Sequence, residues 1–376
     1  MLVGTQARAA VLGAFGEPFE IRDVELDALR AHEVLVRIVG AGICHTDLSA
    51  AAGAVPIPVP AVLGHEGAGV VEAVGSAVDT VAPGDHVVLS FSACRACRNC
   101  REGHPAYCEH FAVRNHSGRR LDGTTTLHVD GAALHGNWFG QSSMATHAVA
   151  LDVDVVQVAN DLPIALLGPL GCGIQTGAGT VLRVLRPRVG ASLVIFGAGA
   201  VGLGAVLAAA VAECGTVVVV DPLPARRELA RSLGATAVLD SAEPDLARRV
   251  RAVVGGGADH SIDTVGSDEV LTTAVAVLRS PGSCATLGLR GRHNPVTLDQ
   301  SALLMGRSVT GVIEGDADPQ QFIPELIALW REGRFPFDKL ITTFDFDDLP
   351  AALDALRAGS VVEPVLTFTH PDERRA

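Results

Sequence analysis

The feature that most constrains the fold of this chain is a set of three glycines at the end of an apolar run. Gly197, Gly199 and Gly202 follow the apolar residues 193–196 and open a second apolar stretch. Glycine at the first two positions allows a tight turn and a close backbone approach to a pyrophosphate, and the third allows a helix to pack closely on a sheet. The pattern predicts a strand, a turn and a helix, with a dinucleotide bound at the turn.

The residues after these glycines continue the alternation of strand and helix. Helices are predicted from Val201 and over 226–233, and the predicted strands are 193–196, 216–220, 237–239, 261–265, 284–287 and 309–313. Such alternation is typical of βαβ units in a parallel sheet. The sequence therefore predicts a doubly wound Rossmann domain with six parallel strands. The apolar run is not a membrane span, because glycines interrupt it and acidic residues follow it closely.

Asp221 ends the second predicted strand, 19 positions past the last glycine of the pattern. A carboxylate at this position accepts hydrogen bonds from ribose hydroxyls and repels a 2′-phosphate, so NAD is favoured over NADP. Arg226 and Arg227 keep the second cofactor open, because an arginine there could receive the phosphate. The alternative interpretation of Asp221 is a solvated residue at a strand end.

The rest of the chain has a different pattern. From Ala7 to about Val149, short β-rich segments separated by turns predict an irregular, mostly antiparallel β domain. Beyond Ile313, helices are expected at 319–332 and 349–358, followed by an extended segment at 361–368 that rejoins the first domain.

Composition narrows the class of protein. The chain has 376 residues, of which 48% are hydrophobic and 19% charged, as expected of an ordered protein with two domains. A formal net charge of −13, without basic residues interleaved with aromatics, argues against a nucleic-acid partner. The N-terminus shows no export signal, and we expect a cytoplasmic, reducing setting and no membrane association.

Four of the eight cysteines lie close together in the spacing C-x2-C-x2-C-x7-C: Cys94, Cys97, Cys100 and Cys108. Short spacings of two residues favour thiolate coordination of a structural zinc ion over a pair of disulfides. Four ligands close such a site, so we assign it no chemistry.

A second group consists of Cys44, His65 and Cys172. Two thiolates and one imidazole leave a fourth position open, as in catalytic zinc sites. Each residue alone has another interpretation, a buried cysteine or a satisfied core histidine. The spacing does not decide between these readings.

Several stretches together resemble the zinc-dependent medium-chain alcohol dehydrogenases. They are 42–47 (Gly-Ile-Cys-His-Thr-Asp), 64–71, 83–88, the four-cysteine segment, 171–177 and 197–202. Within that family, residues 115–118, 139–146, 171–179 and 314–316 are similar to the aryl-alcohol (benzyl alcohol) dehydrogenase branch.

The resemblance implies an α/β protein with a GroES-like β-rich catalytic domain and a Rossmann dinucleotide-binding domain. It places the first domain, with both zinc sites, at residues 1–173 and the NAD-binding domain at 174–311. Residues 312–376 would return to the catalytic domain. Cys44, His65 and Cys172 become the expected ligands of a catalytic zinc, giving two Zn²⁺ per chain with the four-cysteine site.

The resemblance also implies roles beside the metal. Thr46 would pass the substrate proton onward, unless it is an inert turn residue, and Glu66 would approach the metal when water exchanges, unless it only balances charge. Asp47 would orient the ligand histidine, or alternatively cap the helix that begins there. The expected cofactor contacts are His45, Thr176, Gly197, Gly199, Val201, Gly202, Asp221, Arg226 and Leu287.

Three positions depart from better-known, liver-type members of the family. Ser49 stands where those enzymes have a histidine that finishes the proton relay, so the last relay step has no assigned residue. His45 replaces an arginine that contacts the pyrophosphate, and Glu363 stands where a basic residue is expected. Fewer positive charges predict weaker NAD binding and faster NADH release, unless Glu363 is solvated.

The implied activity is hydride transfer between NAD and primary aromatic or allylic alcohols or their aldehydes. Phe91, Trp138, Phe139 and Leu287 are the candidate pocket walls, although each could equally be core. Six of the thirteen histidines lie between 104 and 147 and are expected at the surface. Two alternatives stay open, a thiol-dependent formaldehyde dehydrogenase and a non-catalytic NAD-responsive binding protein. The family suggests a homodimer or homotetramer.

Overall fold

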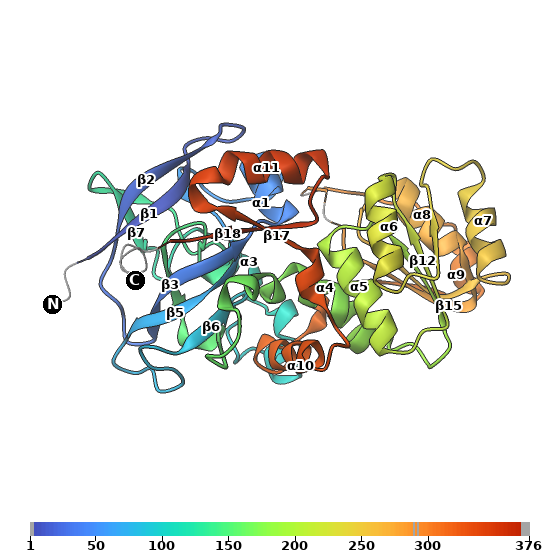
Figure 1. Cartoon of the computed structure of the whole chain (residues 1–376), viewed down its shortest axis with the longest axis horizontal. Coiled ribbons are helices and arrows are strands. Elements are labelled where there is room, and N and C mark those ends of the chain that lie inside the picture. The colour runs from blue at the N-terminus through green and yellow to red at the C-terminus, as the bar shows by residue number, and fades with distance from the viewer. Residues whose placement is uncertain (1–3, 289, 292, 370–376) are drawn as a thin grey trace. The chain divides into compact units, whose positions relative to one another are not determined.

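A computed structural model describes residues 4–288, 290–291 and 293–369 (Figure 1). The chain forms two compact units. The first consists of residues up to Cys172, residues 318–324 and the residues from Ile341 onward, and the second consists of 173–317 and 325–340. Residues 312–317 and 325–340 therefore belong to the second unit, and only the remainder of the C-terminal region belongs to the first.

The first unit is built on two sheets. The described strands of one sheet have the order β4-β1-β2-β7-β8 and pair antiparallel: β4 (Ala61–Val62), β1 (Thr5–Leu12), β2 (Phe19–Leu26), β7 (Leu127–Val129) and β8 (Ala132–Leu134). The other has the order β10-β6-β5-β3-β18-β17, with β9 also paired to β3: β10 (Val155–Val158), β6 (His86–Leu89), β5 (Glu66–Val74), β3 (Glu33–Gly42), β18 (Glu363–Thr367), β17 (Ile341–Asp345) and β9 (His147–Leu151).

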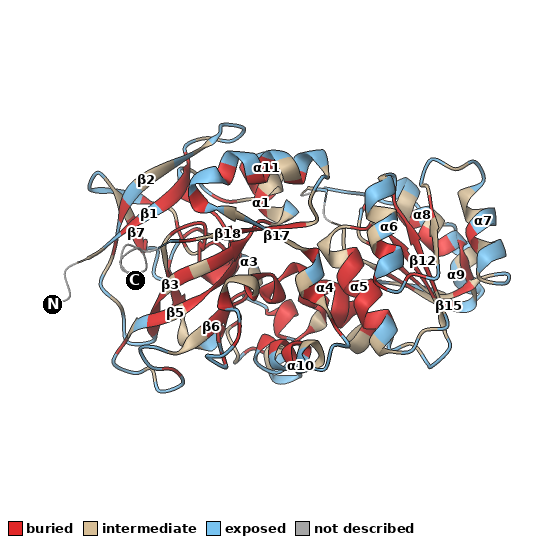
Figure 2. Ribbon diagram, viewed as in Figure 1, coloured by how far each residue is buried: buried red, intermediate tan, exposed pale blue. Residues whose placement is uncertain are grey.

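The C-terminal strand β18 joins this second sheet through antiparallel pairing with β3, where Val365 lies opposite Gly42. The expected return of the extended segment to the first domain is thus observed as a strand in its sheet. Most residues of β3, β5, β6 and β18 are buried, whereas β17 at the edge has no buried residue (Figure 2). The helices of the unit are short: α1 (His45–Ala51), α2 (Arg98–Arg101), α3 (Phe111–His116) and α11 (Leu349–Ala358).

The second unit contains the predicted doubly wound sheet. Its described strands are all parallel and have the order β13-β12-β11-β14-β15-β16: β13 (Ala237–Leu239), β12 (Thr216–Val220), β11 (Ser192–Phe196), β14 (Ala258–Asp263), β15 (Leu278–Thr286) and β16 (Arg307–Gly311). The order reverses between β11 and β14, which is where a doubly wound sheet binds its nucleotide. The prediction of six parallel strands is confirmed.

The helices of the second unit follow from their sequences. They are α4 (Gly173–Gly179), α5 (Ala200–Val211), α6 (Pro224–Ser232), α7 (Leu246–Val253), α8 (Asp268–Ala276) and α9 (Gln300–Leu304), while α10 (Pro319–Arg331) contributes residues to both units. Helix α5 has no charged residue and is buried continuously from Gly202 to Ala209, as expected of a helix that is apolar on every side. Figure 2 shows α4 and α5 mostly in red. Among the described residues, no helix has the length and apolarity to cross a bilayer.

Gly202 packs against the turn that precedes its own helix. A Cβ atom added at Gly202 would lie 1.9 Å from the carbonyl oxygen of Gly197 and 3.5 Å from Ile195 Cγ2. The backbone has no room to yield there, because Gly197 is itself held in the left-handed region at φ +96°.

We expect Gly202→Ala to destabilise the second unit by about 1–3 kcal/mol, because the added methyl overpacks a rigid backbone contact. Gly311→Ala is the matched control, since a Cβ at Gly311 meets nothing within 4 Å. Thermal unfolding followed by circular dichroism should show a lower midpoint for the first variant and a near-parental midpoint for the second. Equal midpoints in the two variants would contradict this account.

Candidate metal centre and nucleotide turn

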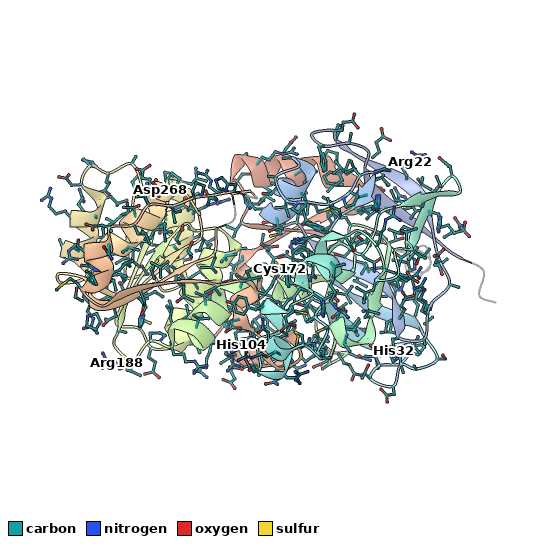
Figure 3. All side chains as sticks on the ribbon, turned by 180° about the vertical axis from the view of Figure 1, so that it is seen from behind. Arg22, His32, His104, Cys172, Arg188 and Asp268 are labelled. Carbon is teal, nitrogen blue, oxygen red and sulfur yellow. The ribbon has the colours of Figure 1, made fainter. Side chains whose placement is uncertain are left out.

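The structure brings together Cys44, His65, Glu66 and Cys172 in the first unit (Figure 3, Cys172 labelled). Cys44 follows β3, the His65–Glu66 pair begins β5, and Cys172 follows the short helical turn Gly168–Gly171. One ligand atom from each of the four lies within 4.8 Å of the others. His65, Glu66 and Cys172 are buried, and Cys44 is partly buried.

The buried carboxylate of Asp47 fixes the geometry of this group. Its Oδ1 accepts hydrogen bonds from His65 Nδ1 (3.0 Å), the Gly64 amide (3.1 Å) and Trp138 Nε1 (2.8 Å), and its Oδ2 accepts from the Cys44 amide (3.2 Å). Asp47 therefore both orients His65 and helps to cap α1, but it is not itself the N-cap residue. Cys44 is the N-cap of α1, and Asp47 is the third helical residue of a capping box.

These contacts leave the other ring nitrogen of His65 for a metal. His65 Nε2 is buried and has no hydrogen-bond partner of ordinary geometry among the described residues. An imidazole that donates through Nδ1 to a carboxylate presents Nε2 as a lone-pair donor, the arrangement usual for metal-binding histidines. Two sulfur atoms and one such nitrogen fit zinc, with a fourth position open.

The electrostatics of the group also suit a cation. A hydrogen bond from the Cys172 thiol, against the effect of burial, lowers the pKa of Cys44 well below its usual value, and His65 contributes to the shift. Burial alone would lower the pKa of His65, but the charge and hydrogen bond of Asp47 outweigh it and raise this pKa well above the usual range. The site thus stabilises a thiolate beside a positive charge, which a metal ion can supply.

Glu363 lies against Glu66, close to this group. A Cβ placed on Gly42 would be 2.1 Å from Glu66 Oε2 and 2.9 Å from Glu363 Oε1, so the two carboxyl groups converge over that glycine. Burial first, and then the charge of Glu66, raise the pKa of Glu363 well above its usual value. The interpretation of Glu363 as a solvated residue is wrong, since only 2% of it is exposed.

Aromatic rings cover one side of His65. Phe139 stacks on the imidazole at 4.5 Å between ring centroids, and Trp138 meets it edge-on at 6.3 Å. His116 stacks on Trp138 at 5.3 Å and is partly buried, so it is not a fully solvated surface residue as the sequence predicted. Phe91 is buried and its ring meets that of Phe111, which in turn contacts Phe139.

The second metal group comprises the four clustered cysteines. One ligand atom from each of Cys94, Cys97, Cys100 and Cys108 lies within 4.8 Å of the others, and all four thiols are free. Backbone amides point at the sulfur atoms, including Cys97 N to Cys94 Sγ (3.1 Å) and Cys94 N to Cys108 Sγ (3.3 Å). The amides of Cys100 and Glu109 lower the pKa of the Cys97 thiol to about 6, which favours the thiolate that binds zinc.

The glycine turn of the second unit has the expected form. Gly197 follows β11, Gly199 is the N-cap of α5, and Val201 lies in the first turn of that helix. The Asp221 carboxylate, at the end of β12, accepts hydrogen bonds from the Ala198 amide (2.8 Å) and from the Leu223 amide (2.8 Å). Asp221 therefore holds the turn itself, a contact that the sequence pattern did not reveal.

The two arginines after β12 differ in their surroundings. Arg226 Nη1 lies 4.0 Å from an ideal Cβ on Gly199, so its guanidinium group reaches the glycine turn. Arg227 instead donates to the carbonyl of Asp221 (2.7 Å) and to the carboxylate of Asp240 (3.0 Å). Arg226 is the one placed to contact a cofactor at the turn.

The remaining candidates fall in separate places. His45 is exposed and Thr46 is partly buried at the start of α1 in the first unit. Thr176 lies in α4, where its hydroxyl donates to Glu314 (3.5 Å), and Leu287 follows β15. Gln141 was not anticipated: its side chain accepts from the Gly67 amide (3.0 Å) and donates to the His65 carbonyl (2.9 Å).

We expect Asp47→Asn to lower the metal affinity of the Cys44–His65–Cys172 group about 10–100-fold, because the amide holds the histidine less well. Asp23→Asn, on an exposed residue of β2, is the control. Metal retained during chelator dialysis, measured by atomic emission, should fall to the content of the four-cysteine site only in the first variant. Unchanged retention there would show that Asp47 does not support the metal.

Comparison with known proteins agrees with the two units. A family model described as zinc-binding dehydrogenase matches residues 200–331, and one described as alcohol dehydrogenase GroES-like domain matches residues 30–158. The chain is 48% identical over 366 residues to geraniol dehydrogenase of Castellaniella defragrans, covering 96% of this chain and 98% of the relative.

Two solved structures are also similar. An alcohol dehydrogenase zinc-binding domain protein from Burkholderia ambifaria has a TM-score of 0.95 and 44% identity, covering 98% of this chain and all (100%) of that one. Benzyl alcohol dehydrogenase from Acinetobacter calcoaceticus has a TM-score of 0.94 and 40% identity, covering 97% and 100%. The expected GroES-like and Rossmann combination is confirmed, and the chain belongs to the zinc-dependent medium-chain alcohol dehydrogenase family.

Proposed function

We propose that this protein oxidises primary aromatic or allylic alcohols, and reduces the matching aldehydes, with zinc and NAD. The observation that carries the proposal is the group of Cys44, His65 and Cys172. Their potential ligand atoms lie close together, and a hydrogen bond to Asp47 orients the His65 ring. Family membership supports alcohol oxidoreduction. The names of the geraniol and benzyl alcohol dehydrogenases support an allylic or aromatic substrate.

Zinc, when bound, supplies a Lewis acid that lowers the pKa of the alcohol, and NAD, when bound, accepts the hydride. Asp47 keeps the His65 ring in one tautomer and orientation, so that Nε2 would be available to hold the metal. Thr46, two residues past Cys44, is proposed as the first group to take the substrate hydroxyl proton, and Glu66 as the nearby carboxylate that assists exchange at the open position.

Aromatic side chains would select the substrate. Phe139 and Trp138 lie within 4.5 and 6.3 Å of the His65 ring, measured between centroids. Flat apolar surfaces beside a ligand histidine suit a planar ring or a double bond next to the reacting carbon, and they exclude water. Phe91 is proposed as an outer wall of this pocket.

The nucleotide turn supports NAD. Asp221 places a carboxylate beside the glycine turn, where it disfavours a 2′-phosphate. Gly197, Gly199 and Gly202 would let the backbone approach the pyrophosphate, with Arg226 as the nearby cation. Val201, Thr176, Leu287 and His45 remain proposed cofactor contacts.

Other parts of the proposal concern metal content and setting. The four-cysteine site is proposed to hold a structural zinc, giving two per chain. Eight free thiols suit a reducing cytoplasmic compartment. A homodimer or homotetramer is proposed from the family. The exposed residues Leu304 (78%) and Met305 (64%), at the end of α9, offer apolar surface for it.

The first test measures NADH formation with benzyl alcohol, cinnamyl alcohol, geraniol, ethanol and the hydroxymethyl adduct of a thiol, with NAD and NADP in parallel and zinc determined on the same sample. We expect turnover of the first three with NAD, weak turnover of ethanol, and two zinc ions per chain. Turnover confined to the hydroxymethyl adduct of a thiol would favour the formaldehyde dehydrogenase alternative. No turnover of any of these substrates, despite bound zinc and NAD, would favour the non-catalytic alternative.

Asp221→Asn tests the cofactor proposal. The amide keeps one acceptor but loses the charge that repels a 2′-phosphate, so we expect kcat/KM for NAD relative to NADP to fall about tenfold. Asp240→Asn is the matched control, because Asp240 pairs with Arg227 and has no contact with the glycine turn among those the structure records. An unchanged preference in Asp221→Asn would remove this residue from cofactor selection.

A further inference from the structure

A cavity of about 340 Å³ lies in the first unit, apart from the candidate metal centre. None of Cys44, His65 or Cys172 lines it. Its walls come from the 30–33 turn, the segment after α3, and the turn at Asn137 and Gly140, with His32 (labelled in Figure 3) also on the wall. The most distinctive lining residues are four arginines: Arg30, Arg114, Arg119 and Arg120.

Two of these arginines already have carboxylate partners. Arg30 Nη1 donates to Asp122 (2.5 Å), and Arg120 donates through Nε and Nη2 to both oxygens of Glu33 (2.6 and 2.9 Å). A bidentate pair of this kind neutralises the guanidinium charge and fixes its position. Arg30 and Arg120 therefore frame the cavity without offering much charge to a ligand.

The other two arginines lack such partners. Within the part of the chain that the structure describes, neither Arg114 nor Arg119 forms an ion pair. Arg114 donates to Ser92 Oγ (3.3 Å), and its Nε is buried without a hydrogen-bond partner. Arg119 donates to the Gly123 carbonyl (2.9 Å). The buried Nε of Arg114 is a donor without an acceptor, which costs free energy that an anion in the cavity would recover, and the exposed Arg119 adds a second positive charge without a carboxylate partner.

Asp154 lies behind the cavity wall, and its carboxyl group repels a bound anion less than a fully ionised carboxylate would. Asp154 is buried, and its Oδ2 lies 3.4 Å from an ideal Cβ on Gly140. Burial raises the pKa of Asp154 to about 7, against the effect of its hydrogen bond with Ser92. Near neutral pH a large fraction of this group is uncharged, so it does not cancel Arg114.

Apolar side chains also line the cavity, beside the polar residues His32, Ser92 and Asn137. Ala31, Leu121 and Leu151 contribute to its walls. An inorganic ion would leave these side chains facing water, whereas an organic anion with an apolar body would cover them. The volume is sufficient for a small ring or a short branched chain that carries one acidic group.

The cavity shares a backbone segment with the candidate metal centre. Asn137 and Gly140 line the cavity, while Trp138, between them, donates to Asp47 and Phe139 stacks on His65. Asn137 and Phe139 both have left-handed φ angles, +56° and +50°, so the segment is conformationally constrained. The segment therefore forms a short covalent connection between the cavity wall and the contacts of His65 and Asp47.

We propose that this cavity binds a small organic carboxylate through Arg114 and Arg119, and that its occupant adjusts the aromatic wall of the metal centre through residues 137–140. The ligand carboxylate accepts hydrogen bonds from the two unpaired guanidinium groups, and its apolar body covers Leu121 and Leu151. The occupant is chemically distinct from an alcohol substrate, and its binding is measurable without turnover.

Binding is tested by calorimetry on the full-length, zinc-loaded protein, with benzoate as the probe. We expect one site in the parent and about tenfold weaker binding in Arg114→Gln and in Arg119→Gln. Binding should be parental in Arg22→Gln, a partly exposed arginine that pairs with Asp130 in the same unit. Benzamide, which lacks the charge, and acetate, which lacks the apolar body, should each bind at least about tenfold more weakly.

Three results would overturn the proposal. The first is that benzoate does not bind the parent protein. The second is that the parent and both arginine variants bind it equally, which would place benzoate elsewhere, and the third is that inorganic phosphate binds as tightly as benzoate. Arg119 is exposed, so Arg119→Gln should fold even if Arg114→Gln does not. Circular dichroism and zinc content of each variant verify the fold.

The second half of the proposal has its own readout. Trp138 and Trp330 are the two tryptophans of the chain, so Trp330→Phe leaves Trp138 as the sole emitter. Benzoate should shift the emission of that protein and leave Trp330→Phe/Arg119→Gln unchanged at the same concentration. Benzoate binding that depends on Arg119 but leaves Trp138 emission unaltered would refute the link through residues 137–140.

Discussion

The carboxylate of Asp47 is the contact on which the rest of the metal centre depends. It is 1% exposed and accepts hydrogen bonds from His65, Gly64, Trp138 and Cys44. A buried charge is tolerated only when its acceptor sites are filled, and here four donors from three chain segments fill them. The start of α1, the loop before β5 and the Trp138 turn are therefore held in one arrangement. The same arrangement brings the potential metal-ligand atoms of Cys44 and His65 together.

Asp221 plays a comparable part in the second unit. Both of its oxygens accept from backbone amides, one in the glycine turn and one after β12. The residue that selects the cofactor in the proposal is therefore also a residue that shapes the turn. In both units a single carboxylate links local backbone conformation to chemistry, so the loss of charge and the loss of structure have to be separated by amide substitutions.

Much of this was predictable from the sequence. Strands β11 and β12 of the parallel sheet follow from nearly uninterrupted runs of buried apolar residues, and the glycine turn and the four-cysteine segment follow from spacing. The burial of Glu363 beside Glu66 and the stacking of His116 on Trp138 were not predictable. These contacts join residues far apart in the chain, and neither carboxyl nor imidazole groups carry a periodic signal that places them inside. The hydrogen bond from Trp138 to Asp47 was not predictable either, because the sequence does not distinguish a tryptophan in a core from one in a pocket wall.

The position of Trp138 has a consequence for how this enzyme can change. The indole is at once part of the proposed wall of the substrate pocket and a donor to the carboxylate that holds His65. A smaller residue there would admit a bulkier alcohol, but it would also release one of the four bonds on Asp47. Substrate range and metal retention are therefore coupled through one side chain. A lineage that broadens its substrate range at this position has to restore the lost donor from another residue, whereas Phe139, which stacks on His65, donates no hydrogen bond to Asp47 that would need to be replaced.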